Sequence, residues 1–319
     1  MKVRKLALVW LTILATVPRI SYSLPTESIV KEFKNMDSIV LDLVSGDCII
    51  KTESTKRIRV EVEYSETLKD VVKPEFMERG KKLKLKERWH SRGSGTLLWK
   101  ITVPKDIDVK FSSASGDFEI DGCSGDIEIS TASGNAAASG CSGKFDIETA
   151  SGDIGLEDCS GVFDISAASG DISMENSKGS VEVSTASGDI YINDFKGTLD
   201  LSAASGDMEI ENVNYEDDSD FSAASGDIDI RFDKMPKVRL DVCVASGDIE
   251  LDLNKNKPTG LIQCIARKDR GRITSDIPFD ITEEFVRNNR TYLKKTIKTG
   301  AAKPEIYLET ASGKISIDK

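Results

Sequence analysis

The chain has 319 residues and a formal net charge of −11, with 39% hydrophobic and only 6% aromatic residues. This acidity makes nucleic acid and anionic lipid surfaces poor partners, because both are negatively charged themselves. No apolar stretch is long enough to cross a bilayer, the short run near the N-terminus included, so we expect no membrane-spanning segment in the mature chain.

Residues 1–23 have the pattern of a secretory signal peptide. Basic residues stand at positions 2, 4 and 5, an apolar run extends from Leu6 to Val17, and the small residues Ser21 and Ser23 precede the expected cleavage site. The apolar run is too short for a transmembrane helix. We therefore expect cleavage after Ser23 and a secreted, periplasmic or cell-surface protein; an uncleaved anchor is the alternative.

Residues 24–110 are expected to form an N-terminal β cap that contains the first strands. Apolar and polar residues alternate over 39–44, 57–64, 82–86 and 97–103. Alternation with a period of two is typical of strands that bury one face. These strands would open the sheet system that follows and cover its end.

Residues 111–254 repeat one phrase, in which Ala-Ser-Gly precedes a short alternating strand. Its glycines are 18 residues apart, and a second set lies midway between them: Gly116, Gly134, Gly152, Gly170, Gly188 and Gly206, then Gly125, Gly143, Gly161, Gly179 and Gly197. A fixed period of this kind indicates a solenoid, whose repeats bury apolar faces only against their neighbours. The predicted fold is all-β: a parallel β-solenoid with irregular β caps, whose 18-residue, two-strand coils consist of nine-residue half-repeats.

Stacking such coils places residue i against residue i+18, with neighbouring strands about 4.8 Å apart. The turn glycines are expected to need a positive φ, and the serine before each glycine to hydrogen-bond turn backbone. One coil, 135–138, offers only alanine methyl groups inward. We expect the rings of Phe145 and Phe163 to occupy the space that these alanines leave.

The repeat lengthens at two places after Gly206. The additions lie at 215–220 and 233–237, and the spacing predicts that both fall on the same edge of the rod. Insertions on one edge of a repeat protein often carry binding, although edges also tolerate extra residues at little cost. We take Tyr215, Glu216, Asp217 and Asp218 as a candidate partner-binding edge.

Residues 255–319 are expected to form a C-terminal cap with a last repeat. The segment 255–310 interrupts the period, and a short helix is expected near Thr282–Asn289. The motif then returns once more, over 309–317.

Acidic residues form two columns when the coils are stacked. One column lies on the outer face of a sheet and the other in a turn row: Glu128, Asp146, Asp164, Glu182, Asp200, Asp220 and Asp241, then Asp117, Asp153, Asp171, Asp189, Asp207, Asp227 and Asp248, with Asn135 in the same row. Like charges at this spacing repel, and calcium bound along the turn row would offset the repulsion. Asx turns within each aspartate's own loop, with screening by salt, are the competing explanation, and no other cofactor is expected.

Three of the six cysteines, Cys123, Cys141 and Cys159, are also 18 residues apart and should stack at one corner of successive coils. An oxidising compartment would permit a disulfide between adjacent coils, whereas small apolar corner residues are the simpler interpretation. A zinc site is not expected, because His90 is the only histidine and there is no Cys-x-x-Cys pair.

The run Ile101-Thr-Val-Pro-Lys-Asp-Ile-Asp-Val, the Ala-Ser-Gly-Asp-Ile repeats and the ending Ile306-Tyr-Leu-Glu-Thr-Ala-Ser-Gly-Lys-Ile-Ser-Ile resemble a bacterial family called "putative adhesin", a domain of unknown function. The resemblance covers residues 38–319. It implies attachment at the cell surface, and it brings no catalytic or ligand-binding residues with it. Lys314 departs from the pattern, because the family usually has aspartate after the glycine.

The sequence favours a non-enzymatic role. No nucleophile, base and orienting group come together by spacing, and the regular rod lacks the interruptions at which β-helical polysaccharide enzymes build their sites. We expect an exported β-solenoid that presents an adhesin-like binding surface at the bacterial cell envelope, to an unidentified protein or glycan. The alternative is a structural or self-assembling envelope scaffold, because open solenoid ends allow end-to-end association.

Overall fold

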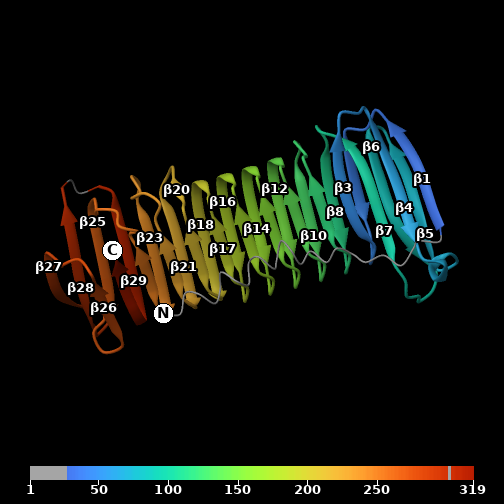
Figure 1. Cartoon of the computed structure of the whole chain (residues 1–319). Coiled ribbons are helices and arrows are strands. Elements are labelled where there is room, and N and C mark those ends of the chain that lie inside the picture. The colour runs from blue at the N-terminus through green and yellow to red at the C-terminus, as the bar shows by residue number, and fades with distance from the viewer. Residues whose placement is uncertain (1–26, 301–302) are drawn as a thin grey trace.

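The computed structural model describes residues 27–300 and 303–319, so the predicted signal peptide lies outside the described residues. The described chain forms a long rod of stacked strands, with the N-terminal strands at one end and the C-terminal strands at the other (Figure 1). Among the residues described, no helix is long and apolar enough to cross a membrane.

The middle of the rod consists of parallel coils, and each coil adds one strand to each of two sheets. Sheet A contains the short strands: β9 (Phe118–Asp121), β11 (Ala136–Ser139), β13 (Ile154–Glu157), β15 (Ile172–Glu175), β17 (Ile190–Asn193), β19 (Met208–Glu211), β22 (Ile228–Arg231) and β24 (Ile249–Asp252). Sheet B contains the others: β8 (Asp108–Ser113), β10 (Ile127–Thr131), β12 (Ser142–Thr149), β14 (Ser160–Ala167), β16 (Lys178–Thr185), β18 (Lys196–Ser205), β20 (Asn214–Tyr215), β21 (Ser219–Ser225) and β23 (Leu240–Ser246).

The register follows the sequence period. In sheet B, Phe145 lies beside Phe163 and Ile147 beside Ile165; in sheet A, Ile154 lies beside Ile172. All of these pairs are 18 residues apart and parallel. The predicted β-solenoid is therefore confirmed.

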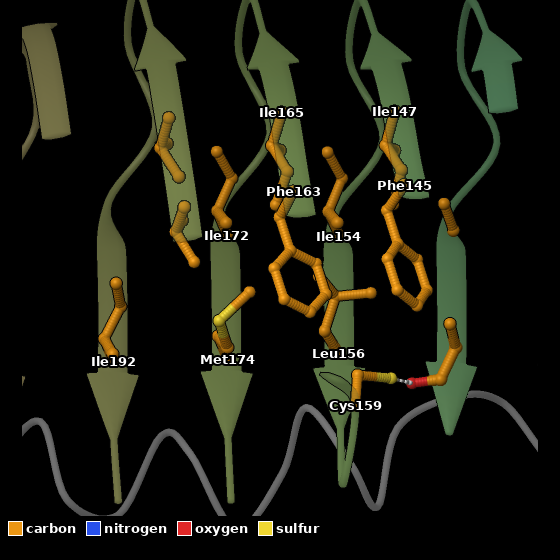
Figure 2. Packing of buried hydrophobic residues seen from close by; sticks show 14 of the residues in the cluster. Phe145, Ile147, Ile154, Leu156, Cys159, Phe163, Ile165, Ile172, Met174 and Ile192 are labelled. Carbon is orange, nitrogen blue, oxygen red and sulfur yellow. Dashed lines mark hydrogen bonds between the residues drawn. The ribbon is translucent and has the colours of Figure 1, made fainter. Parts of the chain in front are cut away.

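The core is a thin layer of apolar side chains between the two sheets (Figure 2). Phe145 and Phe163 project from sheet B and stack, with ring centroids 4.6 Å apart. Ala136 and Ala138 on sheet A are buried in the same cluster. Large rings and small methyl groups thus share one core, which keeps it densely packed although residue size varies from coil to coil.

The turn glycines are required mainly because the backbones of successive coils touch there. A Cβ added at Gly152 would lie 1.9 Å from the carbonyl oxygen of Gly134, and one at Gly170 would lie 1.8 Å from that of Gly152. The expected positive φ is wrong for these two residues, because neither adopts one. It does occur in the other half of the coil, as at Gly161, where φ is +149° and the same close approach is present.

The turns are held mainly by a hydroxyl other than the expected serine, although Ser115 Oγ donates to the Val44 carbonyl oxygen at 3.5 Å as expected. Thr131 Oγ1 accepts the N–H of Gly134 at 2.9 Å, Thr149 accepts that of Gly152 at 2.8 Å, and Thr185 repeats the bond further along the rod. These threonines stand three residues before the glycine rather than directly before it. Each bond pairs a buried turn amide that would otherwise be costly to bury.

At the N-terminal end the chain folds outward and then returns. The elements in chain order are β1 (Glu27–Lys34), β2 (Ser38–Asp42), β3 (Asp47–Glu53), β4 (Arg57–Tyr64), the 3-10 turn η1 (Glu66–Leu68), β5 (Val72–Arg79), β6 (Lys82–Trp89) and β7 (Leu97–Pro104). The coil of β2 and β3 stacks directly on β8 and β9, while β6 and β7 lie outside it. Antiparallel strands finish the end, with β5 beside β6, β4 beside β7, and β1 beside β4.

One buried carboxylate organises this cap. Glu87 is 8% exposed and accepts backbone N–H groups from Val44, Ser45 and Gly46, at 2.8 to 3.1 Å. The indole N–H groups of Trp89 and Trp99 also donate to it, both at 3.1 Å. Five donors compensate the burial of the charge and fix the first glycine turn of the rod.

At the C-terminal end, the final repeat lies inside the cap and not at its tip. The elements are β25 (Gly260–Arg267), β26 (Gly271–Ser275), β27 (Ile281–Arg287), β28 (Arg290–Thr299) and β29 (Glu305–Asp318). Strand β29 runs through both sheets and stacks directly on β23 and β24. Strands β25 and β26 pair with its other side, and β28 and β27 continue sheet B in antiparallel fashion.

The helix expected near Thr282–Asn289 is wrong, because this segment is strand β27 and the turn of a hairpin. Asn288 and Asn289 both adopt positive φ values, of 51° and 58°, and Arg287 pairs with Arg290 across them. Two consecutive residues in this conformation form the tight turn whose twist suits antiparallel strands, and asparagine tolerates it well.

The glycine contact can be tested with a pair of alanine substitutions. We expect Gly170→Ala to lower the free energy of unfolding by about 2 kcal/mol or more, because its Cβ would collide with backbone. Gly155→Ala is the control: its Cβ would lie 3.7 Å from Ser173 Oγ, so stability should be unchanged or raised by up to about 1 kcal/mol. Denaturant unfolding measures both, and equal effects would contradict the contact argument.

Candidate functional site

The turn aspartates form a continuous ladder of hydrogen bonds between coils. Asp153 Oδ1 accepts the backbone N–H of Asp171 at 3.0 Å, and Asp171 Oδ1 accepts that of Asp189 at 2.9 Å. The same bond runs from Asp47 at one end to the amide of Lys314 at the other. Each carboxylate therefore caps the following coil and not its own loop, which corrects the expected Asx turns.

In this ladder, the aspartates of the proposed calcium row accept hydrogen bonds from backbone amides. One oxygen of each aspartate already accepts an amide, and the members are spread along the rod: Asp117, Asp153, Asp171, Asp189, Asp207, Asp227 and Asp248. Within 27–300 and 303–319, no three His, Cys, Asp or Glu side chains come close enough to hold a metal ion. The row acts as backbone capping that is repeated once per coil.

The second acidic column covers the outer face of sheet B. Seven carboxylates lie in register, one per coil: Glu128, Asp146, Asp164, Glu182, Asp200, Asp220 and Asp241. Basic residues stand at its two ends, where Lys110 pairs with Glu128 and Arg239 pairs with Asp241 at 2.6 Å. Between these ends, none of the members forms an ion pair with a described Lys or Arg, so the column is a line of unneutralised charge.

The charge of the rod is concentrated in the coils. Residues 111–254 contain 31 Asp and Glu but only 7 Lys and Arg, whereas residues 27–110 contain 15 acidic and 18 basic residues. The shaft is therefore strongly acidic, and the N-terminal cap is slightly basic. Such a segregation gives the shaft a negative electrostatic potential and the N-terminal cap a slightly positive one.

The structure moves Tyr215 from the expected binding edge into the core. Its side chain is 6% exposed and packs against Phe232 and Phe221, with ring centroids 6.2 and 6.3 Å away. The lengthened coil has space for this ring, and the phenol occupies that space. Tyr215 therefore belongs to the packing of the insertion and not to its surface.

The other three residues of the edge remain exposed. Glu216 pairs with Lys196 at 2.8 Å, and Asp217 Oδ1 accepts the amide of Asp218. The Asp218 carboxylate accepts the amide of Arg239, beyond the second insertion. This bond places the two insertions side by side, as the spacing predicted.

The stacked cysteines are buried thiols in this structure. Cys123, Cys141 and Cys159 are each no more than 1% exposed, and the Cys123 amide donates to the sulfur of Cys141 at 3.3 Å. Burial raises the pKa of the Cys123 thiol to about 11. The Cys159 thiol donates to the carbonyl oxygen of Ala138, so the sulfur atoms also pair backbone at this corner (Figure 2).

These observations define the class of protein: a capped, two-sheet β-solenoid with an acidic shaft. The chain matches the Toastrack DUF4097 family over residues 36–269 and belongs to that family.

Solved structures resemble the chain only distantly. A "putative cell adhesion protein" from Clostridium sporogenes is 13% identical, covers 92% of this chain and 98% of its own, and has a TM-score of 0.21. A "putative lipid binding protein" from Parabacteroides distasonis is 12% identical over 92% and 98%, with a TM-score of 0.39. A "putative adhesin" from Bacteroides fragilis is 11% identical over 92% and 97%, with a TM-score of 0.33. These TM-scores are too low to support an argument about function, and no curated protein matches the chain.

The Tyr215 hydroxyl predicts the effect of a substitution. It is buried, and within the described chain it has no hydrogen-bond partner. We expect Tyr215→Phe to raise the free energy of unfolding by about 1 kcal/mol, because the substitution removes an unpaired polar group and keeps the ring. Thermal unfolding measures the change. Tyr215→Leu is the control and should destabilise, because it loses the aromatic packing; a lower stability of Tyr215→Phe would contradict the prediction.

The acidic surface predicts an unusual dependence of stability on pH. On sheet A, Glu209, Asp229 and Glu250 lie in register, and reduced solvation together with neighbouring carboxylates raises the pKa of all three. Raised values mean that the folded protein binds more protons than the unfolded chain, so the free energy of unfolding falls as pH rises from about 4 to 7. Asp42 is the opposite case, because its hydrogen bond with Lys86 lowers its pKa. This carboxyl group therefore affects the free energy of unfolding only at lower pH.

We therefore expect a higher Tm at pH 5 than at pH 7.5. Salt at 0.5 M should reduce the difference, because it screens exposed charges. Asp229→Asn should reduce it as well. A lower Tm at pH 5 than at pH 7.5 would show that these carboxylates do not determine how stability depends on pH.

Proposed function

We propose that this protein is an exported, non-enzymatic β-solenoid that presents an adhesin-like binding surface at the bacterial cell envelope. The observation that carries the proposal is the column of seven carboxylates on sheet B. Folding brings these charges to within one strand spacing of each other, at a cost that nothing in the core requires. A basic protein or an amino-bearing glycan would lower that cost on binding.

The geometry of the rod supports the same proposal. The parallel register repeats one carboxylate per coil, so an extended partner can meet the same group many times. Several weak ion pairs on one rigid surface give a useful overall affinity, although each exposed pair contributes little. The exposed edge at Glu216, Asp217 and Asp218 adds acid beside this face.

The self-assembling scaffold is the weaker proposal. At the N-terminal end, antiparallel strands finish both sheets, and the outermost strands there carry residues that discourage pairing. At the C-terminal end, antiparallel strands finish sheet B alone. Pro74 lies in β5, and Lys31 and Lys34 lie in β1. Proline and lysine on edge strands are known protections against edge-to-edge association.

Charge reversal on sheet B tests the proposed surface. The purified chain from residue 24 onward, labelled fluorescently, is added to bacterial cells that lack the protein. We expect Asp146→Lys, Asp164→Lys and Glu182→Lys, combined in one variant, to reduce cell binding at least tenfold, and 0.5 M salt to weaken wild-type binding. Failure of the wild-type chain to bind would refute an adhesin-like role.

The matched control changes the same charge on the opposite face. Asp121→Lys, Glu157→Lys and Glu175→Lys lie in one row of sheet A and should leave binding within about twofold of wild type. An equal loss in both variants would assign the effect to net charge and not to sheet B. Protease added to intact cells tests location: survival of the protein until the envelope is opened would favour an internal scaffold.

A further inference from the structure

The N-terminal end of the rod contains a cleft that the proposed function does not use. It lies between β1 and β5, where the two sheets part, and has a volume of about 480 Å³. Its lining comes from β1, the end of β4, the loop after η1, β5 and the residue after β6. This volume is within the range of sites for small organic ligands.

The floor of the cleft is apolar and continuous with the core. Val72 and Tyr64 line the cleft but are only 3% and 8% exposed, because most of each side chain packs into the core. Phe76 stacks on Phe33 with ring centroids 6.1 Å apart, and it lies 5.9 Å from Trp99. A floor of this kind offers apolar surface that an apolar group can cover.

The rim of the cleft is basic, in contrast to the acidic shaft. The exposed residues Lys31, Lys69, Lys73 and His90 face a single acid, Asp70. Lys69 is already paired with Glu27, whereas neither Lys31 nor Lys73 forms an ion pair with a described acid. The Lys31 ammonium lies 4.3 Å from the centroid of the Phe76 ring, which holds a positive charge directly above the apolar floor.

We propose that this cleft binds a small amphiphilic anion, that is, an apolar chain that ends in one acidic group. The acidic group of the ligand lies between Lys31 and Lys73, and its hydrocarbon chain lies along Val72, Pro74 and Phe76. Burial of the hydrocarbon chain supplies affinity, and the two ammonium groups select a negatively charged head group. The site is independent of the acidic face of sheet B, because it lies on the cap at the end of the rod.

Calorimetric titration with two surfactants of equal chain length tests the charge selection. Dodecanoate and dodecyltrimethylammonium are each titrated into the chain from residue 24 onward, below their micelle concentrations. We expect dodecanoate to bind with one site per chain and at least tenfold more tightly than the cation. Equal affinity, preference for the cation, or no dodecanoate binding would overturn the proposal.

The chain length of the ligand tests the apolar floor. Octanoate and decanoate should bind more weakly than dodecanoate, by about two- to fourfold for each methylene removed. An affinity independent of chain length would indicate simple ion pairing with lysine and would overturn the cleft as the site.

Substitutions on the rim then locate the site. Lys31→Glu and Lys73→Glu, combined, should weaken dodecanoate binding at least tenfold, while thermal unfolding verifies that the variant is folded. The control, Lys56→Glu with Lys105→Glu, changes the same net charge at exposed positions that do not line the cleft. An equal loss in the control would overturn the proposal, whereas unchanged control binding would support it.

Discussion

The structure depends on the close contact of backbone at the turns between coils. Strands in both sheets lie one hydrogen-bond spacing apart, so the turns that join them must stack at that spacing too. Only glycine permits this, because a single methyl group at Gly152 or Gly170 would lie less than 2 Å from a carbonyl oxygen. The period of the sequence, the thin core and the straight columns of surface residues all follow from this contact.

The same spacing explains how the acidic residues can stabilise and destabilise the rod at once. The hydrogen bonds that turn aspartates accept from backbone amides offset their mutual repulsion, as where Asp153 accepts the amide of Asp171. Within the described part of the chain, Asp164 and Glu182 on sheet B form no such bond to backbone, and their proximity is only a cost. The two acidic columns thus act differently: the turn row holds the coils together, whereas the column on sheet B remains a line of surface charge.

The regular part of the fold could be predicted because its information is local and repeated. Alternation, glycine spacing and the 18-residue step fix the coils, their register and the inward residues, Phe145 and Phe163 included. The exceptions arise from contacts distant in sequence. Glu87 meets a turn more than 40 residues earlier, and nothing in the pattern around it indicates that role.

Other residues were misassigned for specific physical reasons. Tyr215 stands among acidic residues and therefore looks exposed, but the longer coil has space for its ring. The Asn288-Asn289 turn reverses a segment that resembles a short helix by composition. The cleft at the N-terminal end could not be predicted from the sequence, because its lining comes from five separate segments, none of which is distinctive by itself.

The position of β29 has a consequence for the order in which the rod can be completed. Residues 305–318 lie between the coil of β23 and β24 and that of β25 and β26, although β25 and β26 precede them in the chain. During synthesis, β25 and β26 therefore exist before the coil on which they rest. The growing rod has a bare edge at β23 and β24 until β29 arrives, and this interval is when a neighbouring chain could pair there by mistake. A rod of this design would benefit from a chaperone that covers that edge for as long as the C-terminal strand is missing.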